Sequence, residues 1–290
     1  MSIKSRYIDA VVLLTIIMAA LLPAAHRASA AGISIDAGLT PAENRWILRS
    51  QIRYMERGNY PNEPGRQMQS FMFPVVVAYG VRPNLTVMVR QALRRTEMEM
   101  HGRSSTSTGF SDFFLLGKYR LYRVNTPAYT FGLAPTVGLE IPSGEDGFTS
   151  DTWDLRFGCF ASGRVRSWGL DLNAAYLWNG MAGTDAGTTD PGDEITIEAA
   201  LAYQMSLASD ASLALAPVIE STFLKALSDS RDGQTVDNTG ESVLLISPGI
   251  KFTWSSFIVE GLVQVPIWQD QEGLQTEREP GFLIGFRLMN

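Results

Sequence analysis

Cysteine, histidine and long apolar runs are scarce in this sequence, and each shortage excludes a class of protein. The 290 residues include one Cys and two His. An internal disulfide is therefore impossible, and a zinc site of the Cys/His type has almost no ligands. Beyond residue 30, no stretch reaches the 18 consecutive apolar residues that indicate a transmembrane helix. The formal net charge of −6 argues against a nucleic-acid partner. We expect no cofactor and no metal site.

The first 30 residues contain the three parts of a secretory signal. Lys4 and Arg6 supply positive charge, residues 10–22 form an apolar run, and Ala28 and Ala30 place small residues at −3 and −1 of a cleavage site. The alternative is a membrane anchor, but the apolar run is short for a span of about 20 residues. We expect export through the Sec pathway, cleavage after Ala30, and a single mature domain over 31–290.

The mature sequence alternates apolar and polar residues with a period of two, which predicts β-strands rather than helices. In the first segment, Trp46, Leu48 and Ile52 share one face, whereas Arg49 and Arg53 share the other. The same alternation predicts about twelve strands, at 44–54, 69–80, 85–98, 112–121, 128–141, 152–163, 168–179, 194–206, 212–223, 242–253, 257–268 and 281–289.

The connections between these strands alternate in length. Short turns such as 81–84 and 164–167 alternate with long polar loops such as 180–193 and 224–241. This pattern is typical of an outer-membrane barrel, and an even strand count places both termini in the periplasm. The alternative is a soluble β-sandwich. Aromatic residues near the ends of the apolar face, as in a membrane girdle, favour the barrel. We therefore predict an all-β fold, a transmembrane antiparallel up-and-down β-barrel in the outer membrane of a Gram-negative bacterium.

Several local motifs occur in an order that resembles a known family. They are YGVRPNLTV at 79–87, TGFSD at 108–112 followed by KYRL at 118–121, GLEIPSG at 138–144, and PGI at 248–250. In this order they resemble the bacterial outer-membrane "transporter" family labelled putative meta-pathway of phenol degradation. Ser111 and Ser143 stand where the family pattern has Gly and Thr. The resemblance implies a barrel that passes small molecules, with aromatic compounds as candidates, and it implies no catalytic residues.

Charged residues on the polar face of the strands are the candidate site, because that face lines the lumen of a barrel. The predicted pore-lining residues are Arg45, Arg49, Arg53, Arg90, Lys118, Arg120, Glu140, Asp154, Arg156, Glu198, Glu220, Lys251 and Glu260. The basic residues cluster on the first, third and fourth strands, and most acidic ones lie on the fifth to ninth and the eleventh. Two interpretations remain open: a pore whose lining orients charged or dipolar solutes, and a closed lumen filled by salt bridges.

Two other classes of function compete with a channel. An enzyme would need a general base, and the only mature histidine, His101, falls in a predicted loop whose nearby serines form no catalytic constellation. A structural or surface-interaction protein is the second alternative, but the long loops have few aromatic residues for an interface. We therefore predict a non-enzymatic channel for passive passage of small solutes. Its partners would be outer-membrane lipid, the small-molecule solute and the outer-membrane assembly machinery.

Overall fold

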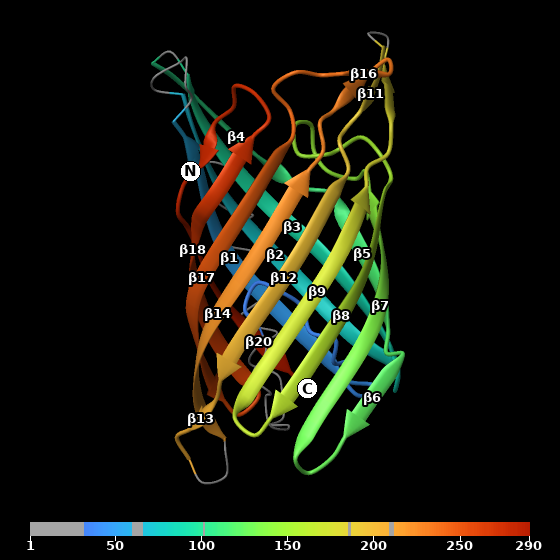
Figure 1. The fold of residues 1–290 in the computed structure, drawn as a ribbon, viewed down its shortest axis with the longest axis vertical. Coiled ribbons are helices and arrows are strands. Elements are labelled where there is room, and N and C mark those ends of the chain that lie inside the picture. Colours follow the sequence, from blue (N-terminus) through green and yellow to red (C-terminus); the bar gives the residue numbers. More distant parts are fainter. Residues whose placement is uncertain (1–31, 60–65, 101, 185–186, 209–211) are drawn as a thin grey trace, which may run out of the picture.

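The protein is a closed barrel of twelve antiparallel strands (Figure 1). The computed structural model describes residues 32–59, 66–100, 102–184, 187–208 and 212–290. The predicted signal segment, 1–30, and His101 lie outside the described residues. In chain order the barrel strands are β1 (Trp46–Gly58), β2 (Gln67–Arg82), β3 (Leu85–Met100), β5 (Phe113–Tyr119), β7 (Tyr129–Ile141), β8 (Asp154–Val165), β9 (Trp168–Trp178), β12 (Glu194–Tyr203), β14 (Leu213–Ala226), β17 (Glu241–Trp254), β18 (Phe257–Gln271) and β20 (Gly281–Met289).

Each barrel strand pairs with the next in the sequence, and β20 pairs with β1 to close the sheet. Closure leaves no unpaired edge, which is the condition for a sheet to lie in lipid. Both the fold class and the strand count predicted from the alternation are thus confirmed. No helix in the described part of the chain is long and apolar enough to cross a bilayer.

Short strands extend the barrel at both ends. The extensions are β4 (Arg103–Phe110), β6 (Tyr122–Asn125), β13 (Met205–Ser206) and β19 (Glu277–Arg278). A separate small sheet above the rim is formed by β10 (Ala182–Thr184), β11 (Gly187–Asp190), β15 (Ser230–Arg231) and β16 (Gln234–Thr235). The strands predicted at 85–98 and 112–121 leave 99–111 as a loop, but β3 and β4 continue there as a paired hairpin. Because that hairpin rises above the apolar belt, it has no apolar alternation to reveal it.

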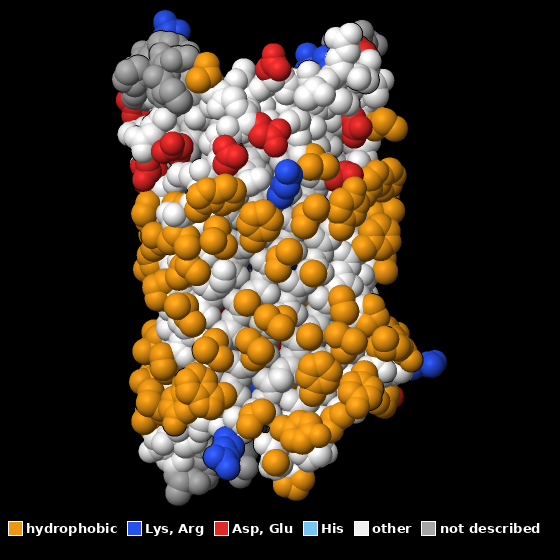
Figure 2. Space-filling view, viewed as in Figure 1, with side chains coloured by type: hydrophobic (Ala, Val, Ile, Leu, Met, Phe, Trp, Pro, Cys, Tyr) orange, Lys and Arg blue, Asp and Glu red, His pale blue; other side chains and the backbone are white. Residues whose placement is uncertain are grey.

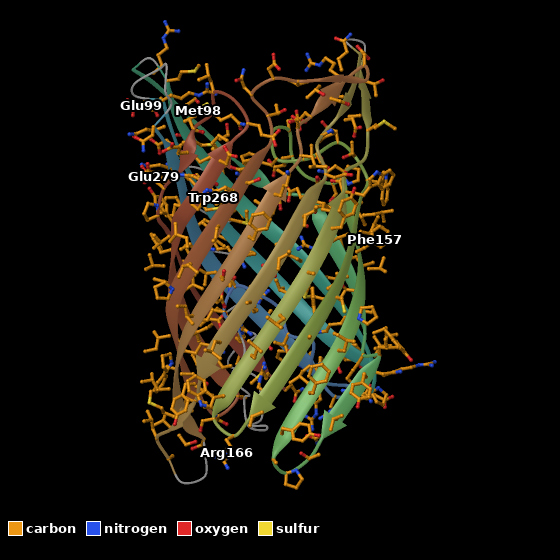
Figure 3. The ribbon with its side chains drawn as sticks, viewed as in Figure 1. Met98, Glu99, Phe157, Arg166, Trp268 and Glu279 are labelled. Carbon is orange, nitrogen blue, oxygen red and sulfur yellow. The ribbon has the colours of Figure 1, made fainter. Side chains whose placement is uncertain are left out.

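The outer surface of the barrel carries a broad apolar belt with acidic residues above it (Figure 2). Aromatic side chains lie toward both ends of this belt. Trp153, Trp178 and Trp268 lie at the end with the long loops, whereas Trp168 and Trp254 lie next to short turns, and all five are exposed. In Figure 3, Phe157 and Trp268 lie along the outside of the wall, while Arg166 lies in a short turn at the opposite end from Met98, Glu99 and Glu279. The positions of the aromatic residues match the two interfacial girdles of an outer-membrane barrel.

Candidate functional site: the barrel lumen

The lumen contains a segment without regular secondary structure, residues 32–40, that precedes β1 and crosses the inside of the barrel. Ile33 and Ile35 are 0% and 2% exposed. Ile33 belongs to an apolar cluster with Val218, Leu262 and Leu283, which come from β14, β18 and β20. The predicted domain boundaries left this segment without a role. The structure places it among the wall charges.

Two acidic side chains of the wall accept hydrogen bonds from this segment. The carboxylate of Glu220, which is 1% exposed, accepts hydrogen bonds from the backbone N–H of Ile33 and, at 3.2 Å, from that of Ser34. The Ser34 hydroxyl also donates to Glu220. Asp171 accepts the N–H of Gly32 at 2.9 Å. These contacts use backbone groups of the segment that would otherwise be buried without partners.

Basic side chains hold the same segment from the other side of the barrel. Lys118 donates to the carbonyl oxygens of Ala37 and Leu39 at 2.7 and 3.0 Å. Arg287 donates to the carbonyl of Gly32 at 2.6 Å, and Arg49 forms an ion pair with Asp36 at 3.3 Å. Charge-assisted hydrogen bonds are among the strong ones. The segment is therefore anchored to at least five strands of the wall: β1, β5, β9, β14 and β20.

Buried ion pairs surround the point where the segment begins. Arg287 lies 2.8 Å from Glu260, and Arg164 lies 2.7 Å from Asp171. Glu260 also accepts a hydrogen bond from Gln51, whose amide bridges to the carbonyl of Ile33. Breaking a buried pair by removing one partner is strongly destabilising, so this network favours a single position for the segment.

Three cavities follow one another along the lumen. An outer cavity of about 360 Å³ is lined by Arg57, Arg94 and Glu194 among others. A central cavity of about 240 Å³ lies next to Ser34, Ile35 and Asp36 of the crossing segment. An inner cavity of about 90 Å³ is lined by Asp36, Ala37 and Leu39 of the same segment. The central and inner cavities share Arg49, Val76, Met88, Leu116 and Phe160 as lining residues. The two cavities beside the segment are thus smaller than the outer one.

The predicted pore-lining residues occupy several distinct environments. Arg49, Lys118, Glu220 and Glu260 contact the segment or its neighbours, as described above. Arg53, Arg90, Arg156 and Glu198 line the central cavity, and Arg90 lies 3.8 Å from Glu140. Arg45 donates a hydrogen bond to Asn290, and Arg120 donates one to Thr40. Asp154 accepts the N–H of Gly180. Lys251 is buried and lies opposite Glu260 on the neighbouring strand. Whether any of them contacts a passing solute stays a prediction.

At the outer rim, Glu241 joins two arginines from different parts of the chain. Arg57 of β1 lies 2.6 Å from its carboxylate, and Arg278 of β19 also bonds to it. Glu241 lies three residues beyond Leu244, which pairs with the girdle residue Trp268, so it is outside the membrane belt. Burial raises the pKa of Glu241, but the two guanidinium groups outweigh this effect and lower the pKa to about 2.

The comparisons with known proteins agree with this geometry. Residues 63–265 match the family described as "Putative MetA-pathway of phenol degradation". The chain belongs to this family. The resemblance inferred from the motifs is thereby confirmed. No curated protein sequence matches the chain.

Two solved structures of outer-membrane barrels are similar in fold to this member of the phenol-degradation family. The COG4313 outer membrane channel from Pseudomonas putida F1 is similar, with a TM-score of 0.70 at 13% identity over 89% of this chain and 100% of that one. The beta domain of the Bordetella autotransporter BrkA is similar with a TM-score of 0.53 at 8% identity, over 85% and 99% of the two chains. At such identities the likeness concerns the fold alone, which is that of an outer-membrane β-barrel.

Two stretches that carry the family resemblance meet at the outer rim. The carboxylate of Asp112, in TGFSD, accepts the N–H groups of Ser143 and Gly144, in GLEIPSG, at 2.9 and 2.8 Å. It also accepts the N–H of Ser150 at 2.7 Å. A Cβ at Gly144 would lie 3.0 Å from backbone oxygens of Phe110 and Phe148. The spacing of the two motifs therefore has a local cause, because one holds the loop that begins in the other.

The crossing segment is the functional element that sequence reasoning missed. Its side chains are mostly small, and its contacts to the wall are made largely by backbone atoms, which carry no residue-specific pattern. The sole indication in the sequence was indirect. It places many charges in a narrow lumen, and buried charges need partners.

Proposed function

We propose that the protein is a channel for passive passage of small solutes, and that they move beside the crossing segment of residues 32–40. The sequence of outer, central and inner cavities carries this proposal, since they follow one side of the lumen from the loop end toward the turn end. The family's description and the likeness to a solved outer membrane channel support passage of small molecules, aromatic ones included. No catalytic step is part of the proposed function.

The inner cavity sets the size limit of this path. An apolar cavity of about 150 Å³ holds benzene, so a volume of about 90 Å³ is too small for an aromatic ring. Ions and the smallest solutes pass with the segment in place. A ring-sized solute passes only when residues 32–40 shift.

Single-channel recording in a planar bilayer, with liposome swelling against a panel of solutes, tests this proposal. Ala78 lines the inner cavity, so Ala78→Trp should narrow the path and lower the conductance. The matched control is Val137→Trp, because Val137 is 55% exposed on the lipid face and a new indole there leaves the lumen unchanged. A folded wild-type protein without conductance, or equal conductance in both variants, would contradict the channel.

The competing function is a structural or surface-interaction protein with a closed lumen. The observation that favours it is the buried network of Glu260, Arg287, Asp171 and Arg164 around the segment. A closed lumen predicts no solute flux in either assay. The same experiments therefore decide between the two functions.

Export and assembly complete the proposal. Cleavage of the signal after Ala30 would leave the crossing segment almost at the new N-terminus, so the segment could enter the lumen as the barrel closes. N-terminal sequencing of protein purified from outer membranes tests the cleavage site. Recognition of the last strand, β20, by the outer-membrane assembly machinery is part of the same expectation.

A further inference from the structure

The central cavity has two chemically different sides. One side is apolar and is formed by adjacent strands: Met72 and Val76 on β2, Met88 on β3, and Phe114 and Leu116 on β5. Phe160 of β8 joins Phe114, Leu116 and Met88 in one apolar cluster. Thioether and aromatic groups of this kind make favourable contacts with a planar ring.

The other side of the cavity is basic. Arg49, Arg53, Arg90 and Arg156 line it, against the two carboxylates of Asp36 and Glu198, which leaves a net charge of +2 from 4 − 2. Counting Glu140, which lies 3.8 Å from Arg90 beyond the lining, still leaves +1. Among the residues that line the cavity, positive charge is therefore in excess, while Glu220 lies behind Ser34 and Glu194 lies in the outer cavity.

The four arginines differ in whether a carboxylate already pairs with them. Arg49 pairs with Asp36 of the crossing segment. Arg53 donates to the neutral amide oxygen of Gln51, and Arg90 lies over the Phe114 ring at 4.5 Å while keeping only a long contact to Glu140. Among the described residues, no hydrogen bond or ion pair joins Arg156 to a partner. Arg53, Arg90 and Arg156 are thus available to an anion.

One glycine brings the apolar and basic sides together. A Cβ at Gly138 would lie 2.7 Å from the Phe114 ring and 3.2 Å from the Arg156 side chain. Because the glycine has no Cβ, the ring lies against the barrel wall between Arg90 and Arg156. The result is an apolar surface with guanidinium groups at its edge.

The outer cavity is the neighbour of the central cavity on its loop side. On four strands the residues that line the outer cavity lie close in sequence to those that line the central one: Met55 and Arg53 on β1, Ser70 and Met72 on β2, Arg94 and Arg90 on β3, and Glu194 and Thr196 on β12. The crossing segment lines the central cavity but not the outer one, so the approach from the loop end does not lead across it.

We propose that the central cavity is a binding site for a small aromatic carboxylate, with the ring against Phe114, Met72 and Met88 and the carboxylate at Arg53, Arg90 and Arg156. A volume of about 240 Å³ exceeds the roughly 150 Å³ that holds benzene, which leaves room for the carboxylate. Guanidinium groups match carboxylates through bidentate hydrogen bonds. Only the onward passage of the bound anion rests on the proposed channel function; the site itself rests on the cavity.

Calorimetric titration of the protein in lipid nanodiscs tests the site, with empty nanodiscs as the blank. The probes are sodium benzoate, benzyl alcohol, which keeps the ring without the charge, and sodium acetate, which keeps the charge without the ring. We expect benzoate to bind at least tenfold more tightly than either. Equal affinity for benzyl alcohol or for acetate would overturn the proposal.

Variants separate the two sides of the cavity. Arg156→Gln should weaken benzoate binding at least fivefold and leave benzyl alcohol unaffected, whereas Arg123→Gln, at an exposed turn-end position, should change neither. Phe114→Leu provides a second test from the apolar side and should weaken benzoate without affecting acetate. Unchanged benzoate affinity in folded Arg156→Gln and Phe114→Leu proteins would overturn the site. Benzoate binding without ion conductance would support the binding site and contradict the channel. Benzoate flux without saturable binding would support the channel and contradict the binding site.

Discussion

Replacing Glu220 by Gln is expected to detach the start of the crossing segment while leaving the barrel closed. The carboxylate of Glu220 is almost fully buried on β14 and receives the N–H groups of Ile33 and Ser34 and the hydroxyl of Ser34. Gln has nearly the same volume, so the substitution creates no cavity. It removes the charge and replaces one acceptor oxygen by an amide that faces hydrogen-bond donors.

The size of the effect follows from the number of hydrogen bonds affected. A hydrogen bond to a charged group contributes about 1.5–3 kcal/mol. Gln keeps one acceptor, so we expect roughly half of the interaction with three donors to be lost, about 2–4 kcal/mol. That loss raises the population in which the N–H groups of Ile33 and Ser34 are released from the wall by roughly 30- to 700-fold. Asp171 and Arg287 still hold Gly32, and Lys118 still holds Ala37, so the detachment is confined to Ile33 and Ser34.

Hydrogen exchange measures this population directly. The amide protection of Ile33 and Ser34 should fall by the same factor, and single-channel conductance should rise because these residues obstruct the lumen. Glu194→Gln is the matched control, since Glu194 lines the outer cavity and no described contact joins it to the segment. If the protection of Ile33 in folded Glu220→Gln equals that in the control, the wall carboxylate does not anchor the segment and the reasoning fails.

Three further predictions concern the rim and the membrane belt. The pKa of Glu241 is about 2 in the folded protein and 4.5 in the unfolded chain. Its ion pairs therefore add to the free energy of unfolding above pH 4.5, and this stabilisation is lost as the pH falls through about 2. Glu241→Gln should thus reduce the free energy of unfolding by up to about 3 kcal/mol at neutral pH. In denaturant titrations the difference between the variant and the wild type should vanish on acidification. A difference that is independent of pH would contradict this. Asp112→Asn should speed amide exchange of Ser143, Gly144 and Ser150 by at least tenfold, and unchanged exchange would show that the loop is held otherwise. Leu172→Arg, midway between the girdles on the lipid face of β9, should cost about 2–4 kcal/mol in a liposome unfolding experiment, and a cost near zero would argue that this face does not meet lipid.

The barrel could be predicted from the sequence because lipid imposes a strict rule on every second residue. Each strand must present apolar side chains outward and satisfy its backbone through its neighbours, so the alternation is repeated on all twelve strands. The same rule stops at the membrane surface. Above the belt, the β3–β4 hairpin pairs through Thr and Ser residues such as Thr106 and Ser107, and no apolar alternation marks it. The sequence predicted a loop there for that reason.

In the lumen the sequence predicts where the charged residues lie but not which groups they bind. Their positions follow from the alternation, since Arg49 and Glu220 must face inward if their neighbours face lipid. Their partners do not follow, because the carboxylate of Glu220 and the ammonium of Lys118 bond to backbone atoms of residues 33–39 and not to each other. Backbone groups are the same at every position and leave no trace in a residue pattern. A surplus of inward charge on the predicted walls is therefore a reason to search a barrel sequence for an additional segment inside the lumen, even where that segment is short and most of its side chains are small.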